Sequence, residues 1–258
     1  MKRLRHTFLL IIMLIATLPL AATDSGNEKL LLEKAQELLK NYKDTEALQV
    51  YEQVLATAPQ NYEALCKASY LHCRIGDRYQ DETTKIEHFE KAKTYAMQAY
   101  GLRPADVEAN FVMAMSIGNL AMVSGARKRL EGINQAKAFV DEALKNNQTH
   151  AGAWYLLGRW HFKMANLNLA EVAAAKMLFG GVSDEASNLK AIDAIQTAIK
   201  YSPETIRYYY DLATIYKELK EDEACVNTLE KAMALQVTTS EDLELARRCK
   251  MMLQHEVR

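Results

Sequence analysis

The sequence predicts an all-α fold in which pairs of helices stack into an elongated array. Composition is the first observation: 49% of the 258 residues are apolar, yet there are only 10 glycines and 4 prolines, which favours long helices over short strands joined by many turns. The second is a helix–turn–helix pattern that recurs five times. The third is that each copy begins three residues after the preceding copy ends.

The pattern is clearest between residues 151 and 203. An aromatic residue, a Leu-Gly pair and a second ring follow one another at helical spacing, and a later segment has small and apolar residues at intervals of four and three before a proline. This is the pattern of a tetratricopeptide repeat, in which two helices pack against each other. We therefore predict a tetratricopeptide-like helix-pair solenoid. The pattern residues are Trp154, Leu157, Gly158, His161, Ala191, Ile195, Ala198 and Pro203.

In this prediction residues 23–258 form a single solenoid. Small residues at matching positions, such as Ala47, Ala92 and Ala136, let the two helices of a repeat approach closely. No pair of helices can bury its apolar face alone, so at least three stacked copies are needed for stability. The repeats span residues 28–59, 62–104, 107–148, 151–203 and 206–237.

The second, third and fourth repeats are longer than the others, and their extra residues fall between the two helices. We expect three enlarged turns that project from one edge of the solenoid. The extra segment of the fourth repeat, residues 168–181, predicts a helix of its own, because Asn168 can cap its start and Gly180 can end it. We expect this helix to pack on its own repeat. Its apolar residues at helical spacing are Leu169, Val172, Ala173 and Met177.

A last helix, residues 240–255, is predicted to cap the array. Thr239 offers a hydroxyl cap, and Glu241 and Asp242 place acids in the first turn, where the helix dipole favours them. A terminal helix with a polar outer face keeps a repeat array soluble. The residues expected to face the repeats are Leu243, Ala246 and Met251.

Residues 1–22 predict a signal peptide that precedes the fold. A basic segment, Lys2 to Arg5, is followed by an apolar run, Phe8 to Leu20, and cleavage is expected after Ala22. The run is short of the roughly 20 residues that cross a bilayer. We expect an exported protein with no membrane span after cleavage. The alternative is an uncleaved segment that anchors the N-terminus in the membrane.

The sequence contains no pattern of catalytic, cofactor-binding or metal-binding residues. The six histidines lack the spacing of a zinc site, no glycine-rich phosphate loop occurs, and no nucleophile stands beside a base. The 32 basic and 33 acidic residues give a net charge of −1, which does not favour nucleic acid. We expect a protein that is not an enzyme, holds no cofactor and binds a protein or peptide.

The concave face, lined by the first helix of each repeat, is the predicted binding groove. Its later half combines rings with cationic groups, which suits an extended peptide with apolar anchors and carboxylates. The alternative is a structural or assembly role in an envelope complex, through the edge that carries the extra segments, where Arg127, Lys128 and Arg129 could contact an acidic partner. The groove candidates are Tyr70, Arg74, Phe111, Asn119, Tyr155, Arg159, Lys163, Arg207, Tyr210 and Lys217.

Four segments resemble stretches of a known family: they are residues 124–137, Gly158 to Phe162, Lys176 to Phe179 and Thr239 to Asp242. Here the chain resembles the regulator of microtubule dynamics family, tetratricopeptide-like proteins of animals with relatives in bacteria. The resemblance covers residues 62–253 and implies a fold rather than a chemical activity. The family name implies microtubule association, but an exported protein would not meet cytoplasmic microtubules. We therefore expect a bacterial relative located in the periplasm.

Overall fold

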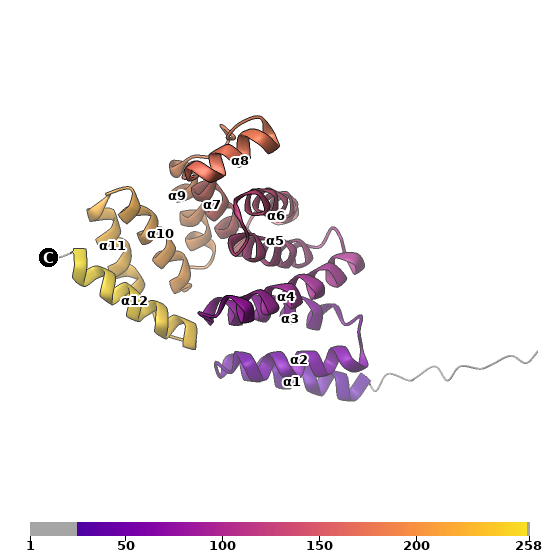
Figure 1. Cartoon of the computed structure of the whole chain (residues 1–258). Helices are drawn as coiled ribbons and strands as arrows, with labels where there is room; N and C mark the ends of the chain where they lie inside the picture. The colour runs from indigo at the N-terminus through magenta and orange to yellow at the C-terminus, as the bar shows by residue number, and fades with distance from the viewer. Residues whose placement is uncertain (1–24, 257–258) are drawn as a thin grey trace, which may run out of the picture.

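The computed structural model describes residues 25–256, and the predicted signal peptide, residues 1–22, lies outside them. The described residues form twelve α-helices and no strand, which confirms the predicted all-α class (Figure 1). None of the helices in this part of the chain is long and apolar enough to cross a membrane. The helices are α1 (Ser25–Lys40), α2 (Asp44–Thr57), α3 (Tyr62–Arg78), α4 (Glu82–Leu102), α5 (Val107–Met122), α6 (Ala126–Asn146), α7 (Ala151–Ala165), α8 (Leu169–Phe179), α9 (Asn188–Tyr201), α10 (Ile206–Glu218), α11 (Asp222–Met233) and α12 (Ser240–Glu256).

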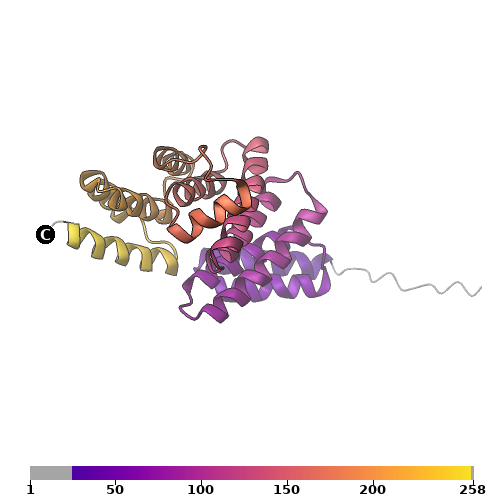
Figure 2. The same ribbon diagram turned by 45° about the horizontal axis from the view of Figure 1, so that its top comes forward.

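The helices stack as consecutive pairs, which confirms the predicted solenoid. α1 packs with α2, α3 with α4, α5 with α6, α7 with α9 and α10 with α11, and each pair also packs on the next. Figure 1 shows the stack bending along its length, so that the first turn of α12 comes back toward α3. In the turned view of Figure 2, α8 (orange) is an additional helix lying against the stack. The inner side of the bend is where the first helices of successive repeats face one another.

In three repeats, a capping side chain determines the residue at which the first helix of the repeat begins. Asn61, Asp106 and His150 each accept a hydrogen bond from a backbone N–H in the first turn of α3, α5 and α7, respectively. Each cap satisfies an N–H that has no partner within the helix, and caps of the Asn and Asp type stabilise a helix by about 1 kcal/mol. These helices begin at Tyr62, Val107 and Ala151, the residues with which three of the predicted repeats begin.

Close packing of two helices explains the Leu-Gly pair of the fourth repeat. A Cβ atom at Gly158 of α7 would lie 2.5 Å from the side chain of Ile195 and 3.0 Å from the carbonyl oxygen of Ala191, both on α9. Glycine therefore allows α7 and α9 to approach this closely. Ala191 and Ile195 are 0% exposed, so the approach is used to bury the apolar stripe of α9 at high packing density.

The second and third repeats do not have the enlarged turns that their length predicted. Their extra residues lengthen helices instead: α4 and α6 each have 21 residues, and the turns before them are only residues 79–81 and 123–125. The physical reason is burial. Phe89 on α4 is 2% exposed and Leu130 on α6 is 0% exposed, so these longer helices bury apolar side chains that a projecting loop would leave in water.

The extra segment of the fourth repeat does form a helix, α8. The Asn168 side chain accepts a hydrogen bond from the Glu171 N–H, and the Glu171 carboxylate accepts one from the Asn168 N–H. This reciprocal arrangement is a capping box, which satisfies two terminal N–H groups at once. The helix ends at Gly180, whose φ of 79° lies in the left-handed region that favours glycine.

The buried face of α8 is not the one formed by the four apolar residues named from the sequence. Glu171 is 0% exposed, whereas Leu169 and Met177 are 91% and 77% exposed. The carboxylate of Glu171 accepts hydrogen bonds from Arg129 of α6 at 3.0 Å and from Lys163 of α7 at 2.8 Å. These two cations, together with the packing of Ala175 and Leu178 on the core, hold this face of α8 inward, whereas Leu169 and Met177 remain in solvent.

α12 packs on α10 and α11, but through a face other than the expected one. Leu245 and Cys249 are 2% and 0% exposed, while Leu243 and Met251 are 65% and 42% exposed. Leu245 and Cys249 stand four residues apart and so share one helix face. Cys249 joins a core cluster of residues from α9, α10 and α11, which ties the C-terminal helix to the end of the array.

Candidate functional site

Two adjoining cavities lie on the inner face of the stack. The outer cavity, about 250 Å³, lies among α3, α5, α7, α10 and the start of α12. The inner cavity, about 370 Å³, lies among α5, α6, α7, α9 and α10. We call the two together the groove, because they meet at four shared lining residues: Met115, Asn119, Leu156 and Arg159.

The inner cavity has mainly apolar walls. The Lys137 ammonium group at its edge lies 2.7 Å from Asp141 and 3.0 Å from Glu185, so its charge is already compensated. A concave apolar site with a few polar groups is the usual form of a ligand pocket. Among the described residues, no group of three or more His, Cys, Asp or Glu is placed to hold a metal ion. The apolar lining residues include Met122, Ile133, Val140, Trp160, Phe162, Ile195 and Ile215.

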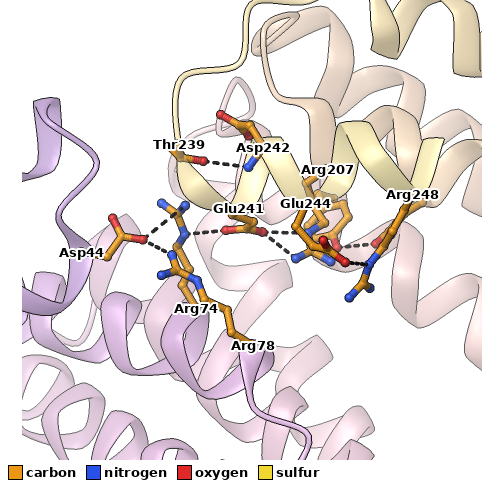
Figure 3. A network of polar contacts seen from close by, with 11 residues as sticks. Asp44, Arg74, Arg78, Arg207, Thr239, Glu241, Asp242, Glu244 and Arg248 are labelled. Atoms are coloured by element: carbon orange, nitrogen blue, oxygen red, sulfur yellow. Dashed lines mark hydrogen bonds and ion pairs between the residues drawn. The ribbon is translucent and has the colours of Figure 1, made fainter. Parts of the chain in front are cut away.

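An ion-pair network, drawn in Figure 3, includes three residues that line the outer cavity: Arg74, Arg207 and Glu241. Glu241 Oε2 accepts a hydrogen bond from Arg74 Nε at 2.8 Å, and Glu241 Oε1 accepts two from Arg207, at 3.0 Å from Nε and 2.5 Å from Nη2. Arg74 Nη2 also lies 3.7 Å from Asp44, which pairs with Arg78. The network thus joins α2 and α3 to α10 and α12, which belong to opposite ends of the chain.

Glu241 is the ionised centre of this network. Burial on its own would raise the pKa of the carboxyl, but the Arg207 and Arg74 guanidinium groups outweigh burial and hold the pKa below its usual value. The side chain is 16% exposed, and the side chains of Arg74 and Arg207 are 17% and 28% exposed. Charge-assisted hydrogen bonds at such shielded positions are stronger than those in open solvent.

Arg159 stands at the junction of the two cavities. Its guanidinium lies 5.7 Å from the centre of the Tyr155 ring, and it forms no ion pair with another described residue. Tyr155, Asp211 and Asp77 all raise the pKa of Arg159. Asp211 is itself engaged, because it accepts a 2.5 Å hydrogen bond from the Tyr155 hydroxyl. Within the described part of the chain, Arg159 is therefore a charged group with no carboxylate bound to it.

Asn119 carries an unsatisfied amide at the same junction. The side chain is 5% exposed, and its Nδ2 has no hydrogen-bond partner among the described residues. The Cys73 thiol lies close by, but a thiol is a weak acceptor. An unsatisfied buried polar group costs about 1–3 kcal/mol, so the burial of Asn119 Nδ2 in this wall is a local cost to stability.

Eight of the ten predicted groove residues line the groove. Tyr210 packs against the core cluster at the end of the array, and Lys217 is exposed in the last turn of α10. Tyr208 lines the outer cavity instead, with its ring centre 4.8 Å from that of Tyr155. The eight are Tyr70, Arg74, Phe111, Asn119, Tyr155, Arg159 and Arg207 in the outer cavity and Lys163 in the inner one, with Asn119 and Arg159 shared.

The polar lining residues missed from the sequence include Asp77, Tyr208, Asp211 and Glu241. The spacing of four residues between Arg207 and Asp211 places both on one helix face, so that signal was available. Glu241 was expected only as a first-turn acid of the capping helix. Its contact with Arg74 spans 167 residues of sequence, and no local pattern encodes it.

The basic residues of the predicted insert edge lie in the first turn of α6 and not on a projecting loop. Arg127 pairs with Glu131 on the same helix, and Lys128 is exposed. Arg129 bonds to the buried Glu171. One of the three is therefore used to hold α8, and two remain at the surface.

Stacked helix pairs around an amphiphilic groove define the class of tetratricopeptide-repeat proteins. The fold is similar to that of a thermophilic TPR protein of Thermus thermophilus, with a TM-score of 0.63 and 18% identity over 88% of this chain and 99% of that chain. The sequence model described as "Regulator of microtubule dynamics protein 1-3" matches residues 31–256. The chain belongs to this family.

Curated relatives carry the family name. The chain is 24% identical over 164 residues to Regulator of microtubule dynamics protein 1 of Caenorhabditis elegans, covering 64% of this chain and 72% of that protein. It is 25% identical over 182 residues to Regulator of microtubule dynamics protein 3 of Xenopus laevis, covering 66% of this chain but 38% of that protein. The match therefore spans well under half of the longer relative.

Proposed function

We propose that the protein is a non-enzymatic scaffold that binds a segment of a partner protein in the groove. The observation that carries this proposal is the junction of the two cavities, where Arg159 has no ion pair among the described residues and Asn119 also lines the wall. A cationic group with no carboxylate partner, placed in a concave and mainly apolar site, is suited to hold an acidic group of a ligand in a fixed orientation. The fold adds support, because stacked repeats commonly present extended binding surfaces.

An extended peptide fits the two parts of the groove. An apolar side chain of the peptide would enter the inner cavity, beside Trp160 and Ile195. A carboxylate would bind Arg159, since guanidinium groups bind carboxylates with two parallel hydrogen bonds. The Asn119 amide oxygen can accept a hydrogen bond from a peptide N–H. The partner segment is thus expected to combine an apolar anchor with an acidic group.

Arg159→Gln tests the proposal, with Arg127→Gln as the matched control. Arg127 is 67% exposed on α6 and lies outside the groove, so both variants lose one arginine. Each protein is used to capture partners from an extract of the source cells, and the captured segment is mapped by cross-linking. We expect Arg159→Gln to lose a partner that wild type and Arg127→Gln keep, cross-linked to groove residues. Retention of every partner by Arg159→Gln would overturn the proposal.

We further propose that this scaffold works in the cell envelope, in the periplasm, after removal of residues 1–22. The basic head and apolar run of that segment support export. A role on microtubules, which the names of the relatives suggest, would require the repeats to face the cytoplasm. Mass spectrometry of the mature N-terminus separates the two: a chain that begins at Thr23 supports export, whereas an intact Met1 in a cytoplasmic protein would contradict it.

A second candidate function is a subunit that assembles with another protein of an envelope complex through α8. The observation that favours it is the exposed apolar face of this helix, with Leu169 at 91%, Met177 at 77% and Phe179 at 48% exposure. Apolar side chains gathered on one short surface helix are typical of interaction surfaces. Glu171 holds the helix to the array from its other side, so the apolar face is presented on a fixed support.

A further inference from the structure

The carboxylate of Glu241 occupies the part of the groove in which an acidic ligand would be expected. Arg74 comes from the second repeat and Arg207 from the fifth, and both line the outer cavity. Each donates to a different oxygen of Glu241. Glu241 belongs to the capping helix, so the chain supplies its own anion to the two arginines.

We infer that Arg74 and Arg207 form a carboxylate subsite for an acidic side chain of the partner, and that Glu241 is an internal ligand which the partner displaces. This inference rests on the proposed function, because it assigns a chemical class to part of the same ligand. In this inference Arg74 and Arg207 differ from Arg159. Glu241 occupies the two arginines until the partner binds, whereas Arg159 binds no carboxylate of the described residues and is available to the ligand at once.

The geometry shows that the subsite recognises a carboxylate group. Both oxygens of Glu241 are engaged, with donor–acceptor distances of 2.5 to 3.0 Å, and Arg207 contributes two of the three bonds. These are the short, charge-assisted bonds that guanidinium groups make to carboxylates. A carboxylate of a peptide could make the same bonds, so exchanging one for the other keeps the charge of the site unchanged.

Arg74 is held in place independently of Glu241. Its Nη2 lies 3.7 Å from Asp44, which is 3% exposed and also pairs with Arg78. Figure 3 shows Asp44 on the side of Arg74 away from Glu241. When Glu241 leaves, Arg74 keeps this partner and its position. Arg207 loses the carboxylate that Glu241 provides, and a charge left unpaired in a shielded site is costly, so the subsite favours refilling by another carboxylate.

The first turn of α12 can move away from the outer cavity while the buried residues of α12 keep their contacts with α10 and α11. The helix is anchored on α10 and α11, through Leu245 and Cys249, which are 2% and 0% exposed. Glu241 lies one turn before Leu245 and reaches α3 through its side chain. Residues 234–239 connect this turn to α11. A small movement of the start of α12 would therefore release both arginines and widen the outer cavity, one wall of which is formed by Thr238, Thr239, Glu241 and Asp242.

An internal ligand lowers the apparent affinity for the external one, because only the fraction of molecules with an open subsite can bind. Removing the Glu241 charge is therefore expected to strengthen the binding of acidic peptides. Glu241→Gln tests this, with Glu244→Gln as the matched control on the same helix. Glu244 is 41% exposed and pairs with Arg247 and Arg248 of its own helix.

The probe is a blocked, fluorescent peptide of alternating leucine and glutamate, compared with its leucine–glutamine counterpart by fluorescence anisotropy. We expect Glu241→Gln to bind the glutamate peptide about tenfold more tightly than wild type, and Glu244→Gln to bind like wild type. The glutamine peptide should not distinguish the variants. If Glu241→Gln binds the glutamate peptide no more tightly than Glu244→Gln, while both bind it through Arg159, the subsite is refuted and the proposed function stands. Absence of binding by every variant would overturn both.

Hydrogen exchange of the unaltered protein gives a second test that does not depend on a variant. Displacement of Glu241 by the glutamate peptide should speed amide exchange at Asp242 and Leu243, whose N–H groups bond to Thr239 in the closed protein, because the first turn of α12 loses its attachment to α3. Slower or unchanged exchange there in the peptide-bound protein would mean that the peptide binds beside a closed α12, and would refute displacement.

Discussion

Lys163 of α7 and Glu171 of α8 form an ion pair of 2.8 Å in which the carboxylate is fully buried. Arg129 of α6 donates to the same carboxylate at 3.0 Å, and so does the Asn168 N–H at 3.0 Å. One side chain thereby joins three helices. The attachment of α8 depends on charge as well as on the packing of Ala175, which is 0% exposed.

Replacing Glu171 by alanine should destabilise the protein strongly. The side chains of Arg129 and Lys163 are only 25% and 23% exposed, and both would lose their carboxylate. Breaking a buried ion pair from one side costs about 3 kcal/mol or more, so the free energy of unfolding in denaturant should fall by about that amount. Glu131→Ala is the control, because Glu131 is 46% exposed and should change it by less than about 1 kcal/mol. Equal losses for the two variants would contradict the prediction.

The same carboxylate should make stability depend on pH. Burial alone would raise the pKa of Glu171, but Lys163, the Asn168 N–H and Arg129 outweigh it and hold the pKa below its usual value. Because the folded pKa lies below the unfolded value of about 4.3, the contribution is complete above that value and is lost as pH falls through the folded pKa. The difference in unfolding free energy between wild type and Glu171→Gln should be constant from pH 7 to about 5 and shrink below it. A difference that grows on acidification would contradict this sign.

The solenoid could be predicted from the sequence because its signals are local. Asn61, Asp106 and His150 cap helices within a few residues of their own positions. Gly158 and the small residues of α9 likewise indicate that two helices of one repeat pack closely. Such features repeat along the chain at recognisable spacing, so helix starts and most groove residues follow from pattern alone.

The remaining features depend on contacts between distant segments. The four apolar residues of α8 gave no sign that Glu171 would turn inward, because its partners Arg129 and Lys163 lie on two other helices. Glu241 was visible as a helix start, but its binding to Arg74 requires the bend of the whole stack. Local periodicity predicts which residues form a helix, but it does not predict which face of the helix contacts a distant segment.

Gly158→Ala should destabilise the contact between α7 and α9. The added Cβ would lie 2.5 Å from the Ile195 side chain and 3.0 Å from the Ala191 carbonyl oxygen, so the helices must move apart. Overpacking of this kind costs about 1–3 kcal/mol, measurable as a lower thermal midpoint. Gly101→Ala in the last turn of α4 is the control, since no atom lies within 4 Å of its added Cβ, and it should not lower the thermal midpoint. A stabilised Gly158→Ala would contradict the close approach.

Charged residues placed on the apolar face of α8 should prevent assembly with a second subunit without destabilising the fold. Leu169 and Met177 are 91% and 77% exposed, so replacing both with aspartate removes apolar surface without breaking a core contact, and the free energy of unfolding should change by less than about 1 kcal/mol. If α8 joins a second subunit, the double variant purified from the source cells should elute alone where wild type elutes in a larger complex. The control replaces Met97 and Leu243, which are 55% and 65% exposed elsewhere, and should retain the complex. Retention of the complex by the α8 variant would contradict assembly through α8, and the groove would then be the remaining candidate surface.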